Sequence, residues 1–300
     1  MSDSLADAAG IDVRRGVPFA APEGDRLRLD LYRPASGVVG ATDAARRAAT
    51  VLVPGSRGRA PDSGELARCA LDLAERGYVC VVPAYRGSDV ASFPAQIRDL
   101  KAAIRWLRAA ADDVGVDPDR IGAFGHGTGA HLAVLAAVTA GEESLAPHAS
   151  AFGGVPIDAA TASSAHDGLA AVVGVAGTYA LEHQPETDDL VALLGGDRES
   201  AADAWERASP SAYLGDAGRP GERDVSQPET AADVPPILLL HGEDDDVMPA
   251  MASELFHDML EERDVTAECV VAADAGHDVH ETQRPFTLGW TEAFFDRHLR

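Results

Sequence analysis

Short apolar runs alternate with longer amphipathic segments along most of the chain. The apolar runs have the length and the content of buried strands, and they fall at residues 50–53, 78–82, 121–124, 169–175 and 236–241. Between them, apolar residues recur three and four positions apart, which predicts helices over residues 66–76, 93–108, 131–138, 251–263 and 285–299. This alternation predicts an α/β fold with a mostly parallel sheet.

The N-terminal part of the chain departs from this pattern. Residues 26–32 alternate apolar and polar side chains, which predicts an antiparallel strand at the edge of the sheet. Residues 1–25 are interpreted as a segment that leads into the fold. Chains of 300 residues with this pattern commonly form one domain, so residues 1–300 are predicted to be a single domain.

The segment Gly125-His126-Gly127-Thr128-Gly129 joins a predicted buried strand to an apolar helix. In the nucleophile elbow G-x-S-x-G, small residues stand two positions before and after the nucleophile, because the turn is sharp and its backbone is strained. Gly125 and Gly129 occupy those two positions, so Gly127 stands where the nucleophile belongs. The sequence therefore predicts an elbow without a nucleophilic side chain.

Two other interpretations of this segment are weaker. With Thr128 as the nucleophile, His126 and Ala130 would have to fill the tight flanking positions, and a β-branched threonine suits a strained backbone poorly. A glycine-rich phosphate loop is the second alternative. Its spacing, however, matches neither a P-loop nor the dinucleotide-binding fingerprint.

Residues 51–138 carry several motifs in one order: a strand with a glycine-bearing loop, a helix, a second strand, an amphipathic helix and the elbow. Together they resemble the carboxylesterase and feruloyl-esterase-like branch of the α/β-hydrolase family. The resemblance implies an eight-stranded, mostly parallel sheet with helices on both faces. It also implies a small lid-like insertion, here over residues 181–234.

The loop after the first core strand resembles the oxyanion loop that reads H-G-G-G in many of these esterases. Here Pro54 replaces the histidine, and Gly55 and Gly58 are the glycines that remain. The resemblance implies that the backbone N–H of Gly55 or Ser56 stabilises an oxyanion together with the N–H of Thr128.

The last third of the chain resembles the part of the family that carries the catalytic acid and histidine. Residues 236–249 resemble the motif H-G-x-x-D-x-x-V/M-P, which places the acid at Asp245, with Asp246 and then Asp244 as weaker candidates. Residues 273–278 resemble the loop of the catalytic histidine, which would be His277. In this chemistry the carboxylate orients the imidazole and stabilises the imidazolium that forms during proton transfer.

The other histidines and the tryptophans receive structural interpretations. His131 is interpreted as a packing residue of its helix and His241 as a hydrogen-bonding turn residue. Neither these two nor His126 and His280 form a metal-ligand spacing such as H-E-x-x-H, so no metal and no cofactor are expected. The three tryptophans lie in helical patterns and are expected in the core, at Trp106, Trp205 and Trp290.

The charge of the chain narrows its range of partners. There are 25 basic and 49 acidic residues, a formal net charge of −24, and Lys101 is the only lysine. Such a surface repels nucleic acid and anionic membranes, so neither is expected as a partner. The resemblance to esterases implies a small ester-like molecule as the ligand. The composition also resembles proteins of salt-loving archaea, in which salt screens the repulsion between carboxylates. A GC-rich genome, which replaces lysine by arginine, is the competing explanation.

The cysteines and the N-terminal residues indicate a reducing compartment. Cys69, Cys80 and Cys269 lie in apolar contexts and are interpreted as reduced thiols. Residues 1–10 lack the basic and apolar regions of a signal peptide, and no apolar run is long enough to span a bilayer. The protein is therefore expected to be cytoplasmic.

Three functions are compatible with a hydrolase frame that has glycine at position 127. The chain could hydrolyse esters weakly, with His277 activating water directly. It could instead bind a small molecule or a partner without chemistry, because a fold does not fix a function. The third alternative is a substitution introduced to trap a substrate.

Overall fold

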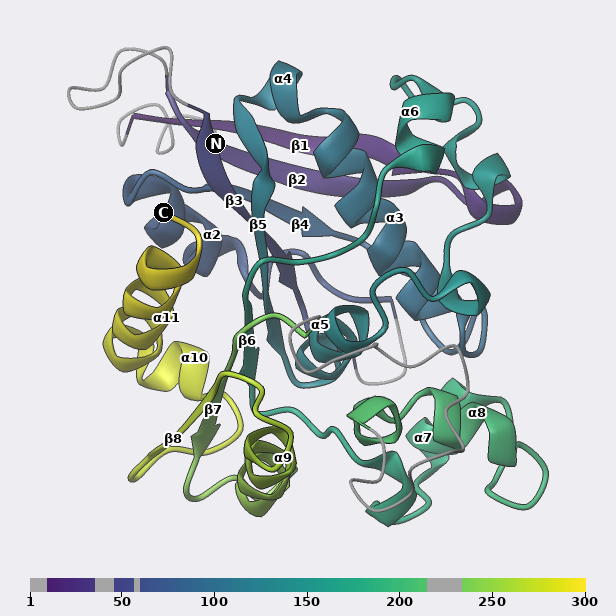
Figure 1. The fold of residues 1–300 in the computed structure, drawn as a ribbon, viewed down its shortest axis with the longest axis vertical. Helices are drawn as coiled ribbons and strands as arrows, with labels where there is room; N and C mark the ends of the chain where they lie inside the picture. The colour runs from purple at the N-terminus through teal and green to yellow at the C-terminus, as the bar shows by residue number, and fades with distance from the viewer. Residues whose placement is uncertain (1–9, 36–45, 57–59, 215–233) are drawn as a thin grey trace.

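An eight-stranded sheet forms the centre of the computed structural model, which describes residues 10–35, 46–56, 60–214 and 234–300 (Figure 1). In sequence order the strands are β1 (Ile11–Ala20), β2 (Leu27–Pro34), β3 (Arg47–Val53), β4 (Val79–Pro83), β5 (Val116–His126), β6 (Val172–Val175), β7 (Ile237–Gly242) and β8 (Ala267–Ala272). Their order in the sheet is β1-β2-β4-β3-β5-β6-β7-β8. The β1–β2 and β2–β4 pairs are antiparallel and all the others are parallel, which confirms the predicted fold class.

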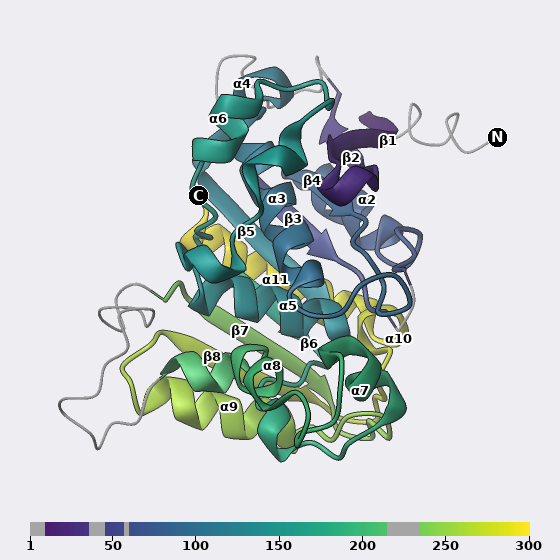
Figure 2. The same cartoon turned by 90° about the vertical axis from the view of Figure 1, so that its right-hand side faces the viewer.

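Helices cover both faces of the sheet (Figures 1 and 2). One face packs against α3 (Ala95–Ala109), α5 (Thr128–Val138) and α9 (Met251–Glu261), and the other against α2 (Ala67–Glu75), α10 (Val279–Thr282) and α11 (Arg284–His298). Successive strand residues point to opposite faces. Accordingly, Val51 and Val53 belong to the first core layer and Leu52 to the second.

Short helices complete the described part of the chain. They are α4 (Ala111–Val114), α6 (Ala159–Ser164), α7 (Asp188–Leu194), α8 (Ala202–Arg207) and the 3₁₀ turns η1 (Pro22–Gly24), η2 (Glu143–Leu145), η3 (Ala149–Phe152), η4 (Leu181–His183) and η5 (Pro210–Leu214). None of the described helices combines the length and the apolar character that crossing a bilayer requires.

The N-terminal segment differs from the prediction. Residues 11–20, expected to lead into the fold, form β1 at the edge of the sheet. The strand predicted over residues 26–32, observed as β2, is antiparallel but lies inside the sheet, between β1 and β4. The alternation of β1 is hidden in the sequence because its pairing with β2 shifts register on either side of Val17 and Pro18.

The region predicted as a lid-like insertion is described up to residue 214. It contains η4, α7, α8 and η5, with a small apolar cluster of its own around Leu181, Leu194 and Trp205. The remainder of the predicted insertion, residues 215–233, lies outside the described residues, and a lid function stays a prediction.

The three tryptophans differ in how far they are buried. Trp106 and Trp205 are buried as expected, whereas Trp290 is 37% exposed, so its expected place in the core was wrong. Trp290 lies on α11, where its ring meets that of Phe286 edge-on at a ring–ring distance of 6.4 Å. All three cysteines are free thiols, as expected, but only Cys80 is fully buried.

Candidate active site

The elbow has the backbone that its glycines predict. Gly127 lies between the end of β5 and the start of α5, with φ 54° and ψ −119°, a conformation that side chains rarely adopt. A β-carbon on Gly125 would lie 2.2 Å from the carbonyl oxygen of Gly129, and one on Gly129 would lie 1.9 Å from that of Val53. Both flanking positions therefore require glycine for packing reasons, in agreement with the elbow register centred on Gly127.

Asp245 and His277 form a hydrogen-bonded pair, although they lie 32 residues apart in the sequence. The His277 Nδ1 and the Asp245 Oδ2 are 2.9 Å apart. The other carboxylate oxygen of Asp245 accepts hydrogen bonds from the backbone N–H groups of Val247 and Met248, at 2.9 and 2.8 Å. The neighbouring acids Asp244 and Asp246 are exposed, whereas Asp245 is buried. Of the three candidates, the geometry favours Asp245.

The environment of Asp245 keeps its carboxylate charged. Burial by itself would raise the pKa of Asp245, but the hydrogen bond from the Met248 N–H and the contact with His277 outweigh it. The pKa of Asp245 therefore lies below the ordinary value. An ionised carboxylate on Nδ1 leaves Nε2 of His277 as the nitrogen that can accept a proton.

The imidazole of His277 faces the elbow. Its Nε2 lies 3.4 Å from the point where a β-carbon on Gly127 would stand. This is the position of a general base beside a nucleophile. The structure thus brings together the three positions that the sequence proposed as catalytic.

His241 is a second imidazole on the same carboxylate. Its Nε2 lies 3.0 Å from the Asp245 Oδ2 and 2.8 Å from the Met248 carbonyl oxygen, and its Nδ1 lies 2.7 Å from the Ser253 Oγ. Burial lowers the pKa of His241, which favours a neutral ring. The expected hydrogen-bonding role is present, and its partner is the candidate acid. The i, i+4 spacing to Asp245 was the available signal.

The candidate oxyanion donors differ in whether their backbone N–H groups already donate a hydrogen bond within the protein. The N–H of Gly55 donates to the Glu65 Oε1 at 3.0 Å, so this amide is already engaged. The side chain of Thr128 donates to the Ser56 carbonyl oxygen at 2.8 Å rather than to His277, which disfavours Thr128 as a nucleophile. The Thr128 N–H donates no hydrogen bond to another described residue, which leaves it and the Ser56 N–H as the available candidates. Gly58 lies outside the described residues.

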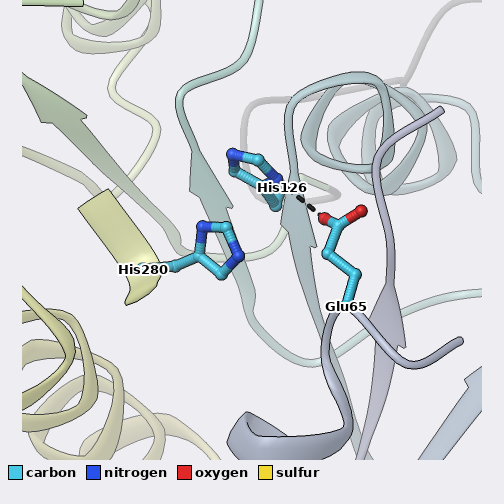
Figure 3. Close-up of side chains that lie close together, drawn as sticks. All are labelled: Glu65, His126 and His280. Atoms are coloured by element: carbon cyan, nitrogen blue, oxygen red, sulfur yellow. Dashed lines mark hydrogen bonds and ion pairs between the residues drawn. The ribbon is translucent and has the colours of Figure 1, made fainter. Parts of the chain in front are cut away.

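Glu65, His126 and His280 form a polar cluster that the sequence interpretation missed (Figure 3). The His126 Nδ1 lies 2.8 Å from the Glu65 Oε1. The centre of the His126 ring is 3.9 Å from the centre of the His280 ring and 4.9 Å from that of His277. Burial, followed by the neighbouring His126, lowers the pKa of His280 to about 4. The remaining interpreted histidine, His131, lies in α5 and packs as expected, with its Nε2 2.7 Å from the Ala208 carbonyl oxygen.

Comparisons with known proteins place the chain among esterase-like sequences. A family model described as BD-FAE matches residues 55–260. The esterase LipQ of Mycobacterium tuberculosis is 28% identical over 86% of this chain and 54% of its own length. The isoprenylcysteine alpha-carbonyl methylesterase ICME of Arabidopsis thaliana is 24% identical over 95% of this chain and 61% of its own. The chain therefore spans little more than half the length of these relatives.

Solved structures of esterases have a similar fold. The apo form of esterase 2 of Thermogutta terrifontis has a TM-score of 0.71 and 22% identity, covering 96% of this chain and 94% of that one. A truncated carbohydrate esterase from gut microbiota has a TM-score of 0.74 and 23% identity, covering 96% of both chains. Structures of the Thermogutta esterase with butyrate or propionate bound are similar as well. At these identities the likeness establishes the fold.

Proposed function

Because the chain belongs to the BD-FAE family and has the α/β-hydrolase fold, we propose that it binds small carboxylic esters over Gly127 and hydrolyses them without an acyl-enzyme. In this proposal His277 activates water directly. The observation that carries it is the placement of the His277 Nε2 3.4 Å from the β-carbon position of residue 127, with Asp245 hydrogen-bonded behind the ring.

The proposed reaction needs no covalent bond to the protein. The ester carbonyl lies at the N-terminal end of α5, and its oxygen accepts a hydrogen bond from the Thr128 N–H. His277 Nε2 removes a proton from a water molecule while the water oxygen attacks the carbonyl carbon, and Asp245 stabilises the resulting imidazolium. When the tetrahedral intermediate collapses, the imidazolium returns this proton to the departing alkoxide. The products are a carboxylic acid and an alcohol.

The absence of a hydroxyl at position 127 sets the expected rate. In a serine hydrolase that has lost its triad, the oxyanion hole and substrate binding still supply about 10³–10⁴-fold acceleration over water. We expect the unaltered chain to accelerate ester hydrolysis by about this factor. Its rate should depend on the leaving group of the ester only as much as the attack of water on the carbonyl does.

Hydrolysis of p-nitrophenyl butyrate tests the proposal. The unaltered chain should release p-nitrophenol linearly from the first turnover, without a burst, and a fluorophosphonate probe should not label it. His277→Gln should lower the rate clearly below that of the unaltered chain, leaving only the contribution of binding and of the oxyanion donors, whereas His148→Gln, which alters an exposed histidine, should not. A burst, covalent labelling, or an equal rate in the His277→Gln variant would each disprove direct activation of water by His277.

A second candidate function is ligand binding without chemistry. It is favoured by the hydrogen bond from the Gly55 N–H to Glu65, which removes one of the predicted oxyanion donors. In that case isothermal titration would detect binding of butyrate or of a non-hydrolysable ester analogue, and the unaltered chain and the His277→Gln variant would have the same background rate.

A further inference from the structure

We propose that Glu65, His126 and His280 bind a divalent transition-metal ion, with Zn²⁺ as the natural probe, directly beside His277. The three side chains come from the turn before α2, the end of β5 and the short helix α10 (Figure 3). This inference concerns metal binding alone and does not depend on ester hydrolysis.

The donor set matches the chemistry of such an ion. Two imidazoles and one carboxylate form the His₂Glu set found in zinc sites, where three protein ligands leave the fourth position to water or substrate. One ligand atom from each residue lies within 4.8 Å of the other two. Ligands about 2.0–2.1 Å from a tetrahedral Zn²⁺ stand about 3.3 Å apart, so the side chains would close by at most about 1.5 Å.

His280 supplies an independent indication. The residue is 7% exposed, and neither ring nitrogen has a hydrogen-bond partner among the described residues. A buried imidazole without partners is costly, and native structures generally provide one. A bound ion accounts for one of the two unpaired nitrogens.

The other two proposed ligands, His126 and Glu65, already make the kind of additional hydrogen bond that orients metal ligands in proteins. Metal-bound histidines commonly donate their second ring N–H to a backbone carbonyl, and bound carboxylates accept further hydrogen bonds. The His126 Nε2 lies 3.2 Å from the His277 carbonyl oxygen, and the Glu65 Oε1 accepts the Gly55 N–H at 3.0 Å. The His126 Nδ1 and the Glu65 Oε1 now lie 2.8 Å apart, and on metal binding each would contact the ion in place of the other.

A second group of possible ligands provides a matched control. His257, Asp258 and Glu261 lie on one side of α9, where His257 is half-buried and both carboxylates are exposed. Their geometry follows from i, i+1 and i+4 spacing on a helix and needs no ion to explain it. Weak binding there would represent the background of an acidic surface.

The experiment is a titration of the full chain, stripped of metal with EDTA, with ZnCl₂ in high KCl, which screens unspecific binding to the surface carboxylates. We expect one tight site per chain and a higher melting temperature with zinc. His280→Ala and Glu65→Gln should each weaken this site at least about 100-fold, while His257→Ala leaves it unchanged. The second variant preserves side-chain volume in case His280→Ala folds poorly.

Cobalt(II) gives a readout that requires no variant. Co²⁺ added to the unaltered, metal-free chain should produce the visible absorption bands of tetrahedral nitrogen–oxygen coordination, and ZnCl₂ should abolish them stoichiometrically. The proposal is overturned if the chain shows no zinc site tighter than that of the Glu65→Gln variant, or if His257→Ala removes the site.

Discussion

Restoring the nucleophile by Gly127→Ser tests whether the rest of the site is still aligned. A β-carbon at residue 127 would meet the His277 Nε2 at 3.4 Å and its Cε1 at 3.9 Å, and no other described atom within 4 Å apart from its chain neighbours. The serine hydroxyl can then reach hydrogen-bond distance of Nε2 with only a small shift of the imidazole. Asp245 already holds the ring from its other side, at 2.9 Å.

The substitution has a cost in stability and a gain in rate. Placing a non-glycine residue at φ 54° and ψ −119° costs about 1–3 kcal/mol of backbone strain. In serine hydrolases, losing the nucleophile reduces kcat by about six orders of magnitude. Recovery here should be smaller, because the Gly55 N–H is engaged by Glu65. We expect a gain of about three orders of magnitude, and covalent labelling by a fluorophosphonate.

Gly127→Ala is the matched control, because it adds the β-carbon and the strain without the hydroxyl. Both variants should melt at a lower temperature than the unaltered chain by a similar amount, and only Gly127→Ser should gain a p-nitrophenyl butyrate burst. Equal rates in the two variants would refute the alignment of His277 with residue 127. Labelling of Thr128 in the unaltered chain would refute the register of the elbow.

Three further predictions concern stability. With a net charge of −24, the melting temperature should rise from low to molar KCl, and an unchanged value would leave genomic base composition as the explanation for the scarcity of lysine. Gly129→Ala should lower the free energy of unfolding by about 3 kcal/mol or more, because its β-carbon would lie 1.9 Å from the Val53 carbonyl oxygen; urea melts that match the unaltered chain would contradict the packing argument. Asp167→Ala should cost about 3–5 kcal/mol, because it leaves the buried Lys101 ammonium, 4.0 Å away, without its carboxylate. Burial raises the pKa of Asp167, but Lys101, the Gly141 N–H and Arg105 together bring it below the ordinary value. The stability that the Asp167 carboxylate contributes is therefore present above about pH 4 and is lost as the pH falls further. Asp167→Ala lacks this contribution, so its free energy of unfolding should fall less steeply in acid than that of the unaltered chain.

The fold was predictable because its signals are local. Each core strand of the parallel part is an apolar run, since both of its faces are covered by helices, and each long helix shows its period in the sequence. The elbow could also be predicted, because both of its flanking glycines are required by close backbone contacts. A β-carbon on Gly125 would meet Gly129, four residues along the chain, and one on Gly129 would meet Val53 at the end of the neighbouring strand. The edge strand β1 was missed because its register shifts conceal the alternation of side chains.

The sequence pointed to a candidate acid and a candidate histidine, but it could not by itself decide which of three neighbouring aspartates is the acid. Asp244, Asp245 and Asp246 have the same side chain, and only burial and the backbone turn after β7 distinguish Asp245 from its exposed neighbours. That distinction depends on where the His277 loop lies. It is therefore a property of the tertiary structure, even though the motif pointed to the same residue.

The sequence by itself determined the order of the strands from β2 to β7 and of the long helices, the glycine at the elbow and the acidic character of the chain. Only the tertiary structure decided the contacts among Glu65, His126 and His280, which stand 61 and 154 residues apart along the chain. It also decided that Glu65 holds the Gly55 N–H. The physical reason is that a local pattern records which face of an element is buried, whereas a cluster of polar side chains depends on how separate elements pack against one another, and no periodicity in the sequence encodes that packing.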